Sequence, residues 1–218
     1  MTARCRRGKQ ARMLLWAGVF LLLGGLGCFA IDRRAAHVFH SVVDRRVEKI
    51  LHRTTDWAKG AHWLLISCAA FAIAWLLQRA LGRSAVLART ELTSLAFLVS
   101  LAIASIILHA TKILLGRRRP RDELELNLYG FRPFSFDLSS DSFPSGHALT
   151  IFCVAVVVSA VWPMLAPLWF AIAACLALTR ALLNSHYLSD VLVGAAVALI
   201  VTREVLLYFF PSLMRVWF

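Results

Sequence analysis

The sequence has few charged residues, and acidic ones are the scarcer kind. Asp and Glu number 12 against 24 Lys and Arg, which gives the 218 residues a formal net charge of +12, yet charged residues make up only 17%. A soluble domain has about 25% charged and roughly 45–50% apolar residues, whereas 60% of this chain is hydrophobic. These proportions argue against a soluble globular fold, whose core could not hide so much apolar surface, and against disorder.

Signals for metal-binding, disulfide-rich or multidomain proteins are also missing. The five cysteines form no C-x-x-C pair and no disulfide spacing. No internal repeat or low-complexity linker divides the chain, so residues 1–218 are expected to form one membrane-embedded domain. A sequence pI near 10.5 would ordinarily suggest a nucleic-acid partner, but here the basic residues stand at the ends of apolar runs. The composition therefore favours an integral membrane protein that handles an anion.

Six apolar runs predict an all-α bundle of six transmembrane helices, because a membrane-spanning helix needs about 20 mostly apolar residues. The last three runs are short or abut polar residues. Trp162 and Pro163 predict a break between the fourth and fifth helices, and Arg203 and Glu204 interrupt the sixth run. The six runs cover residues 13–31, 62–77, 92–115, 147–162, 164–179 and 187–201.

The basic segment 1–12 precedes the first run, which makes a cleaved signal peptide an alternative to a retained helix. The apolar core exceeds the usual length, about 7–15 residues, and no clear A-x-A site precedes Asp32, so a retained helix is favoured. Six spans place both termini on one side, and the basic N-terminus favours the cytoplasm. The basic residues of 32–61 and 116–146 then lie on the extracytoplasmic side. A count of Lys and Arg on the two sides would, taken alone, favour the opposite orientation.

Segment 32–61 has apolar residues at helical spacing with basic residues between them. This pattern predicts an amphipathic helix on the membrane surface, with a solvated loop as the alternative. The aromatic residues of 205–218 similarly predict an interfacial tail. The basic residues of the first segment include Arg33, Arg34, Arg45, Arg46, Lys49 and Arg53.

The end of the third run carries Lys112 and Arg119-Pro120. Seven residues are close to two helical turns, so the two cations share a face if the helix continues. An ordinary cluster of basic side chains at a membrane boundary would look the same.

The sequence Ser142-Phe-Pro-Ser-Gly-His147 stands immediately before the fourth run. A helix that starts there has free backbone N–H groups and a dipole that favours an anion. His147 at this position is suited to proton transfer near neutral pH. The alternative is an N-cap serine followed by an interfacial histidine.

A third polar group comprises Arg180, His186 and Asp190. His186 and Asp190 are four residues apart at the start of the sixth helix, hence on one face. An aspartate that accepts a hydrogen bond from one imidazole nitrogen leaves the other free as a nucleophile. A structural His-Asp pair is the alternative.

All three groups lie at ends of predicted spans, and alternation of the spans brings these ends to the same side of the membrane. Cations, two histidines, an acid and a helix N-terminus in one interfacial pocket indicate a phosphate site with its own nucleophile. The order K-x6-R-P, P-S-G-H and S-R-x5-H-x3-D resembles the signature of the type-2 phosphatidic acid phosphatase superfamily, which also includes vanadium haloperoxidases. The resemblance covers residues 112–190 and departs at Thr179, where the family usually has serine; a hydroxyl is retained.

The resemblance implies a role for each matching residue. His186 would attack phosphorus to give a phosphohistidine with help from Asp190, and His147 would protonate the leaving oxygen. The family works without a metal, and members of this build place the pocket on the extracytoplasmic face, here of a bacterial inner membrane. The residues that match the family's phosphate ligands are Lys112, Arg119, Ser145, Gly146 and Arg180.

A pocket at a membrane interface predicts a substrate that is itself in the membrane, a lipid phosphate or diphosphate. The aromatic residues and arginine of 121–142 could seat acyl chains or a sugar headgroup, and a plain surface loop is the alternative. The resemblance implies lipid A, phosphatidylglycerophosphate or undecaprenyl diphosphate as the substrate, and the basic residues on the extracytoplasmic side favour lipid A. No obligatory protein partner is evident. A small transporter, or a membrane anchor that binds anionic lipid or nucleic acid, is the competing interpretation.

Overall fold

The computed structural model describes residues 3–134 and 141–215, and side chains only within 11–134 and 141–214. Most side chains of segment 1–12, Phe136 in the aromatic segment 121–142, and Trp217 in the predicted interfacial tail 205–218 therefore lie outside the described residues. Apart from one isolated β-bridge between Arg117 and Phe131, the described residues form helices, turns and loops.

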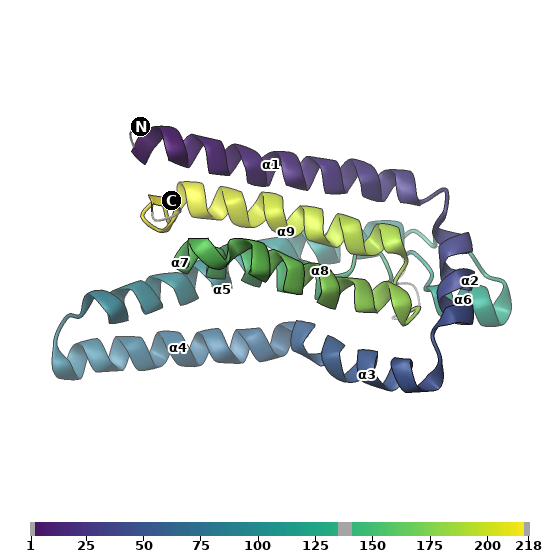
Figure 1. The fold of residues 1–218 in the computed structure, drawn as a ribbon, viewed down its shortest axis with the longest axis horizontal. Helices are drawn as coiled ribbons and strands as arrows, with labels where there is room; N and C mark the ends of the chain where they lie inside the picture. The colour runs from purple at the N-terminus through teal and green to yellow at the C-terminus, as the bar shows by residue number, and fades with distance from the viewer. Residues whose placement is uncertain (1–2, 135–140, 216–218) are drawn as a thin grey trace.

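Among the described residues, six long helices run along the bundle and three short ones lie near one end (Figure 1). The short helices are α2 (Asp32–Val42), α3 (Arg45–Thr55) and α6 (Pro120–Leu126). The long helices are α1 (Ala3–Cys28), α4 (Gly60–Leu81), α5 (Ala85–Leu115), α7 (Gly146–Val161), α8 (Ala166–Leu182) and α9 (Leu188–Tyr208).

Five segments of the described chain are long and apolar enough to cross a membrane, and α7 is a shorter apolar helix of 16 residues. The all-α prediction is confirmed, and the count of six spans stays a prediction. The fourth and fifth runs separate at Trp162, and a 3-10 turn (Pro163–Leu165) joins α7 to α8. The five segments are Ala11–Cys28, Arg45–Leu81, Ala85–Leu115, Pro163–Leu182 and Leu188–Tyr208.

Helix α9 continues past the polar pair that interrupts the sixth run. The Arg203 Nε donates a hydrogen bond to the Ala11 carbonyl of α1 at 2.7 Å, and Arg203 also pairs with Glu204. Because these polar groups are satisfied near the end of the bundle, the helix extends to Tyr208, beyond the 201 limit of the sixth run.

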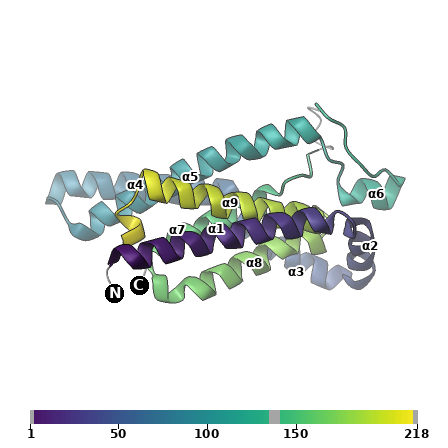
Figure 2. The same cartoon turned by 90° about the horizontal axis from the view of Figure 1, so that it is seen from above.

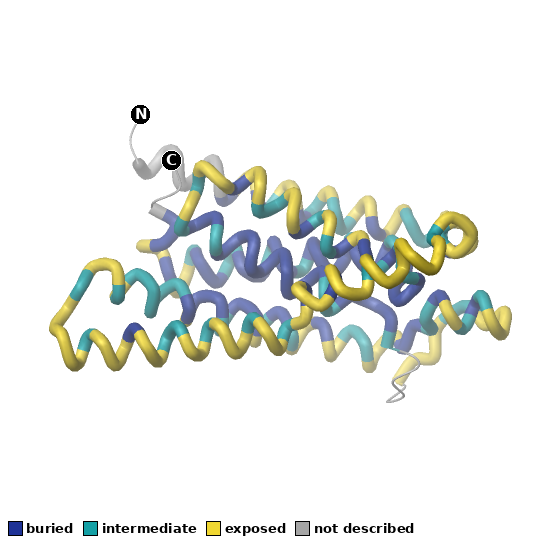
Figure 3. The backbone as a smooth tube through the Cα atoms, turned by 60° about the horizontal axis from the view of Figure 1, so that its bottom comes forward, coloured by how far each residue is buried: buried dark blue, intermediate teal, exposed yellow. Residues whose placement is uncertain are grey.

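Helix α9 is at the centre of the bundle, in contact with α1, α5, α7 and α8 (Figures 1 and 2). Most residues of α7 and α9 are buried, whereas Ala74 alone is buried in α4, which packs mainly on α5 (Figure 3). Helix α1 approaches α9 closely: a Cβ at Gly25 would lie 2.7 Å from Val193 Cγ2. Small residues permit such close packing of membrane helices, where apolar burial from water does not drive association.

Segment 32–61 forms two helices, not the single amphipathic helix that we expected. Asp44 stands between them in an extended conformation and accepts hydrogen bonds from the backbone N–H groups of Arg46 and Val47, both at 2.8 Å. This N-cap starts α3 and ends any continuation of α2. Helix α2 runs across the end of the bundle, and α3 leads through a 3-10 turn (Asp56–Ala58) into α4 (Figure 1). A position on the membrane surface stays a prediction for both helices.

The two ends of the bundle contain different elements. Helix α1 begins and α9 ends at one end, whereas α2 and α6 lie at the other (Figures 1 and 2). The direction of each long helix brings the last turns of α5 and α8 and the first turns of α7 and α9 to this second end. The three polar groups of the sequence therefore meet there.

Candidate active site

Helix α5 ends three residues after Lys112. Lys112 and Arg119 therefore do not lie on one face of a continuous helix, which was the arrangement that their seven-residue spacing predicted. Gly116 has a left-handed conformation (φ 56°) and donates its N–H to the Lys112 carbonyl at 2.8 Å, a common way to end a helix. Arg119 instead stands at the N-cap of α6. The two cations still converge, because both bind Asp141.

Asp141 holds both of these predicted phosphate ligands. The Lys112 Nζ donates to the Asp141 carbonyl at 2.5 Å and lies 3.3 Å from Oδ2; the Arg119 Nε lies 3.0 Å from Oδ1, with a second contact from Nη2. Burial alone would raise the pKa of Asp141. The Arg119 hydrogen bonds and the Lys112 charge lower it by more, so the net pKa is below its ordinary range. The ionised Asp141 carboxylate thus binds the two cations that could otherwise bind a phosphate.

Ser145 and Gly146 form the start of α7. Ser145 is the N-cap, and its backbone N–H donates to the Asp190 carbonyl at 3.0 Å. A Cβ at Gly194 of α9 would lie 2.5 Å from the Ser145 carbonyl oxygen, so only glycine permits this approach. The beginning of α7 is therefore fixed against α9. Burial, and after it the positive charge of Arg180, lowers the pKa of His147 beside this contact to about 3.

His186 is buried and held by a backbone carbonyl. Its Nδ1 lies 2.7 Å from the Ser142 carbonyl oxygen and 3.8 Å from Asp190 Oδ2. The hydrogen bond that we expected from His186 to Asp190 is therefore replaced by one to Ser142. Asp190 acts on His186 indirectly, through the neighbouring residues. It accepts hydrogen bonds from Ser142 Oγ (2.6 Å) and from the Tyr187 N–H (2.8 Å). A donated Nδ1–H leaves Nε2 with a free lone pair.

The surroundings of His186 favour its neutral form. Burial lowers the pKa of its imidazole more than the nearby Asp190 carboxylate raises it, so the net pKa is below the ordinary 6.5. A neutral imidazole with a free Nε2 can act as a nucleophile at neutral pH.

Arg117 is the main functional residue that the sequence did not reveal. Its side chain is completely buried; Nη1 donates to Asp190 Oδ1 (2.5 Å) and Ser189 Oγ (2.6 Å), and Nη2 to Asp32 Oδ2 (2.8 Å). Ser189 Oγ in turn donates to Asp32 Oδ2 at 2.5 Å. We call Arg117, Asp32, Asp190 and Ser189 the buried cluster.

Aromatic rings surround the guanidinium of Arg117. Its Cζ lies 4.3 Å from the centre of the Phe29 ring and 4.2 Å from that of Tyr187. Burial lowers the pKa of Arg117, but Asp190 and Asp32 raise it by more, so the residue stays charged. In the sequence it is one of three consecutive arginines, and no local pattern separates it from its neighbours.

Unlike Lys112, Arg117 and Arg119, Arg180 forms no ion pair with a carboxylate among the described residues. Its Nε is buried and has no hydrogen-bond partner among those residues. An unsatisfied buried donor costs about 1–3 kcal/mol, which an anion in the site would offset. We call Lys112, Arg119, Arg180 and Asp141 the phosphate cluster.

The described residues contain no group of three or more His, Cys, Asp or Glu side chains that could hold a metal ion. The donors gathered at this end of the bundle are cations, imidazoles and the N-terminus of α7. These groups bind oxyanions, and His186 adds a nucleophile.

Known proteins resemble this chain in part of its sequence and in its fold. Lipid A 1-phosphatases from Rhizobium etli and Rhizobium johnstonii are each 30% identical over 97 residues, 44% of this chain, and the match spans only 42% and 40% of those proteins. The crystal structure of a transmembrane PAP2 type phosphatidylglycerolphosphate phosphatase from Bacillus subtilis has a TM-score of 0.62 at 18% identity, covering 89% of this chain and 93% of that one. Together with the apolar helices, this fold indicates an integral membrane protein.

The family comparison covers the whole site. The model of the PAP2 superfamily matches residues 93–213, which is more than half of the chain and includes all three polar groups. With the motif order and the site geometry described above, this match shows that the chain belongs to the PAP2 superfamily.

Proposed function

We propose that this protein is a metal-independent lipid phosphatase that works through a phosphohistidine intermediate. The observation that carries the proposal is His186: a buried, neutral imidazole whose Nδ1 is held by the Ser142 carbonyl, beside cations that can bind phosphate. Positive charge that is already in place stabilises the charge that develops on a transferring phosphoryl group.

The reaction needs two steps. In the first, His186 Nε2 attacks phosphorus, the bond to the lipid oxygen breaks, and His147 gives that oxygen a proton. The negative charge of the bound phosphate raises the pKa of His147, so that His147 carries this proton when substrate is bound. In the second, His147 takes a proton from water, whose oxygen attacks phosphorus and releases inorganic phosphate with His186 restored. Arg180, the Ser145 hydroxyl and the Gly146 N–H would bind the phosphoryl oxygens throughout.

The substrate phosphate must displace the Asp141 carboxylate from Lys112 and Arg119. Lys112 and Arg119 contact Asp141 in this structure, and a phosphate that binds them replaces one anion by another. Asp141 is therefore an internal competitor for the site.

The substrate is a lipid phosphate or diphosphate in the membrane. The names of the two relatives and of the structural neighbour support this class, and the lipid A 1-phosphatases favour a lipid A type headgroup over phosphatidylglycerophosphate or undecaprenyl diphosphate. We place the site end of the bundle at the extracytoplasmic face of a bacterial inner membrane, with both termini in the cytoplasm. The bilayer and the lipid are the only partners that this activity requires.

Phosphate release by purified protein tests the proposal directly. We expect inorganic phosphate from a panel of lipid phosphates, inhibition by vanadate, which imitates the pentavalent transition state, and no effect of a metal chelator. His186→Ala should abolish release while the protein still inserts into membranes, and His109→Ala, on the exposed surface of α5, is the matched control. Normal turnover by His186→Ala would support the transporter or membrane-anchor interpretation instead.

A further inference from the structure

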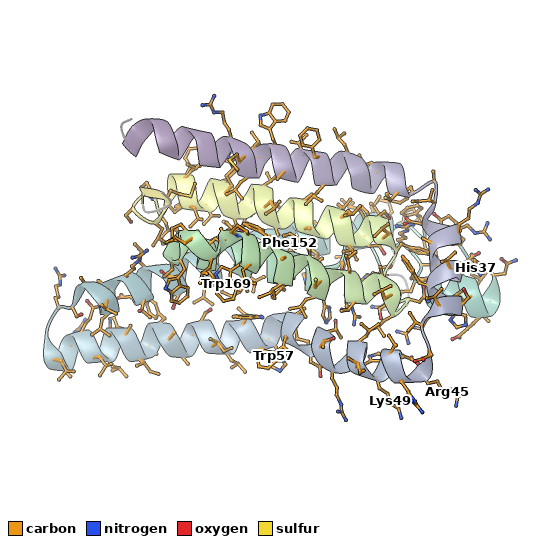
Figure 4. All side chains as sticks on the ribbon, viewed as in Figure 1. His37, Arg45, Lys49, Trp57, Phe152 and Trp169 are labelled. Atoms are coloured by element: carbon orange, nitrogen blue, oxygen red, sulfur yellow. The ribbon has the colours of Figure 1, made fainter. Side chains whose placement is uncertain are left out.

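A cavity of about 540 Å³ lies beside the active site, where α2, α3 and α6 meet the loop between α8 and α9. This volume is within the range of about 300–1,000 Å³ that is usual for small-molecule sites. Figure 4 shows Arg45, one of its lining residues, at the same end of the bundle as His37 of α2.

The cavity adjoins the phosphate cluster. Asn184 lines it from the α8–α9 loop and precedes His186 by two residues. Arg121 lines it from the first turn of α6, and the charge of Arg121 acts on Arg180. A lipid whose phosphate contacts Arg180 and His186 can therefore extend its headgroup into this space.

Contacts between α2 and α6 and the cap of α3 hold the walls of the cavity in place. Arg33 of α2 donates through Nε (2.8 Å) and Nη2 (2.5 Å) to Glu123 of α6, whose side chain is only 1% exposed, and His37 lies 3.9 Å from the same carboxylate. The Asp44 cap sets the start of α3. This gives the basic segment 32–61 a role that its sequence did not indicate.

The polar lining carries both signs of charge. Arg45 and Arg121 offer donors, while Glu48 and Glu125 offer acceptors. Asn184 is 6% exposed, and its amide oxygen has no hydrogen-bond partner among the described residues, so the wall holds a further acceptor that awaits a donor. An ionised phosphate offers only acceptors and would be repelled by the two carboxylates.

Hydroxyl and amide groups match this lining better, because they both donate and accept hydrogen bonds. Phe39 adds an aromatic side chain to the wall, and an aromatic surface suits the apolar face of a sugar ring. We propose that the cavity binds the sugar part of a phosphorylated glycolipid, with the phosphate of the same lipid at His186. This inference rests on the proposed lipid phosphatase function and narrows its substrate class.

Two substrates separate the headgroup site from the phosphate site: a glycolipid that carries its phosphate on a disaccharide, and phosphatidic acid, which has no sugar. The double variant Glu48→Gln, Glu125→Gln should lower kcat/KM about tenfold for the glycolipid, because two charged acceptors are lost, and leave phosphatidic acid turnover unchanged. Glu204→Gln, the same chemical change at the opposite end of the bundle, is the matched control.

A steric variant tests the same cavity independently of charge. Val43, between α2 and α3, lines the cavity and is half-buried, so Val43→Trp should fill space needed by the sugar and reduce glycolipid turnover alone. Equal losses on both lipids, or no loss on either, would overturn the headgroup site and leave the phosphatase proposal standing. If the unmodified protein released phosphate from neither lipid nor from any other lipid phosphate, the proposed function itself would fail.

Discussion

The buried cluster and the phosphate cluster lie at the same end of the bundle, and their cations come partly from the same three consecutive arginines. Arg117 is fully buried and is paired with two carboxylates, at 2.5 and 2.8 Å. In the phosphate cluster, Lys112 and Arg119 share one carboxylate, and Arg180 forms no ion pair among the described residues. Desolvated cations paired with their own carboxylates fix geometry, whereas incompletely neutralised cations near the surface can bind an anion.

Disruption of the buried cluster should have the largest effect. Arg117→Met keeps much of the side-chain volume but leaves Asp32 and Asp190 as buried carboxylates without their cation, and loss of one partner of a buried ion pair costs about 3–5 kcal/mol. We expect the free energy of unfolding to fall by that amount in a denaturant titration in mixed micelles. Arg118→Met, at the adjacent and less buried position, should change little; equal effects at the two positions would refute the distinction.

Disruption of the phosphate cluster should affect catalysis and not folding. Arg180→Met removes a donor to the transferring phosphoryl group, and loss of one such donor lowers kcat by about 100–1,000-fold. The free energy of unfolding should not fall, because the lost Nε had no partner among the described residues. Steady-state phosphate release and unfolding measured on the same preparation check both halves. A destabilised variant would assign Arg180 to the structural part of the site.

Asp141 gives the phosphate cluster its only carboxylate among the described contacts, so its charge should matter in the opposite direction. Asp141→Asn removes the anion that competes for Lys112 and Arg119, and we expect vanadate to bind about three to ten times more tightly. The inhibition constant at fixed pH and ionic strength measures this. Weaker vanadate binding would mean that Asp141 positions the two cations for substrate.

The smallest effect concerns pH. Because burial lowers the pKa of His186, its imidazole stays neutral below pH 6.5, and nucleophilic activity should be lost only as pH falls through that lowered value. Asp190 opposes the lowering, so Asp190→Asn should move the acid limb of the kcat/KM profile to still lower pH in whatever activity remains. A limb above pH 6.5 in the unmodified protein would be inconsistent with a desolvated nucleophile.

Local sequence patterns predicted the long apolar helices and the meeting of the three polar groups, because alternation of these helices places their ends together whatever the packing. They did not predict the break between α2 and α3. They did not distinguish Arg117 from Arg118, since burial of one arginine depends on Asp32, which is 85 residues away. Two helix boundaries could have been predicted from residue type: Asp is a preferred N-cap, as at Asp44, and Gly is a preferred residue after a helix end, as at Gly116. The link from His186 to the Ser142 carbonyl has no such signal, because a backbone acceptor is not encoded by residue type.

The central claim is a covalent bond between His186 and phosphorus. His147→Ala combined with a substrate whose leaving group needs no proton, such as a nitrophenyl phosphate, should let the first step proceed and slow the second, so that the intermediate accumulates. Rapid quenching at alkaline pH and peptide mass spectrometry should then locate a phosphoryl group on His186. Continued phosphate release with no phosphoryl group on His186, or with one on another residue, would contradict the mechanism.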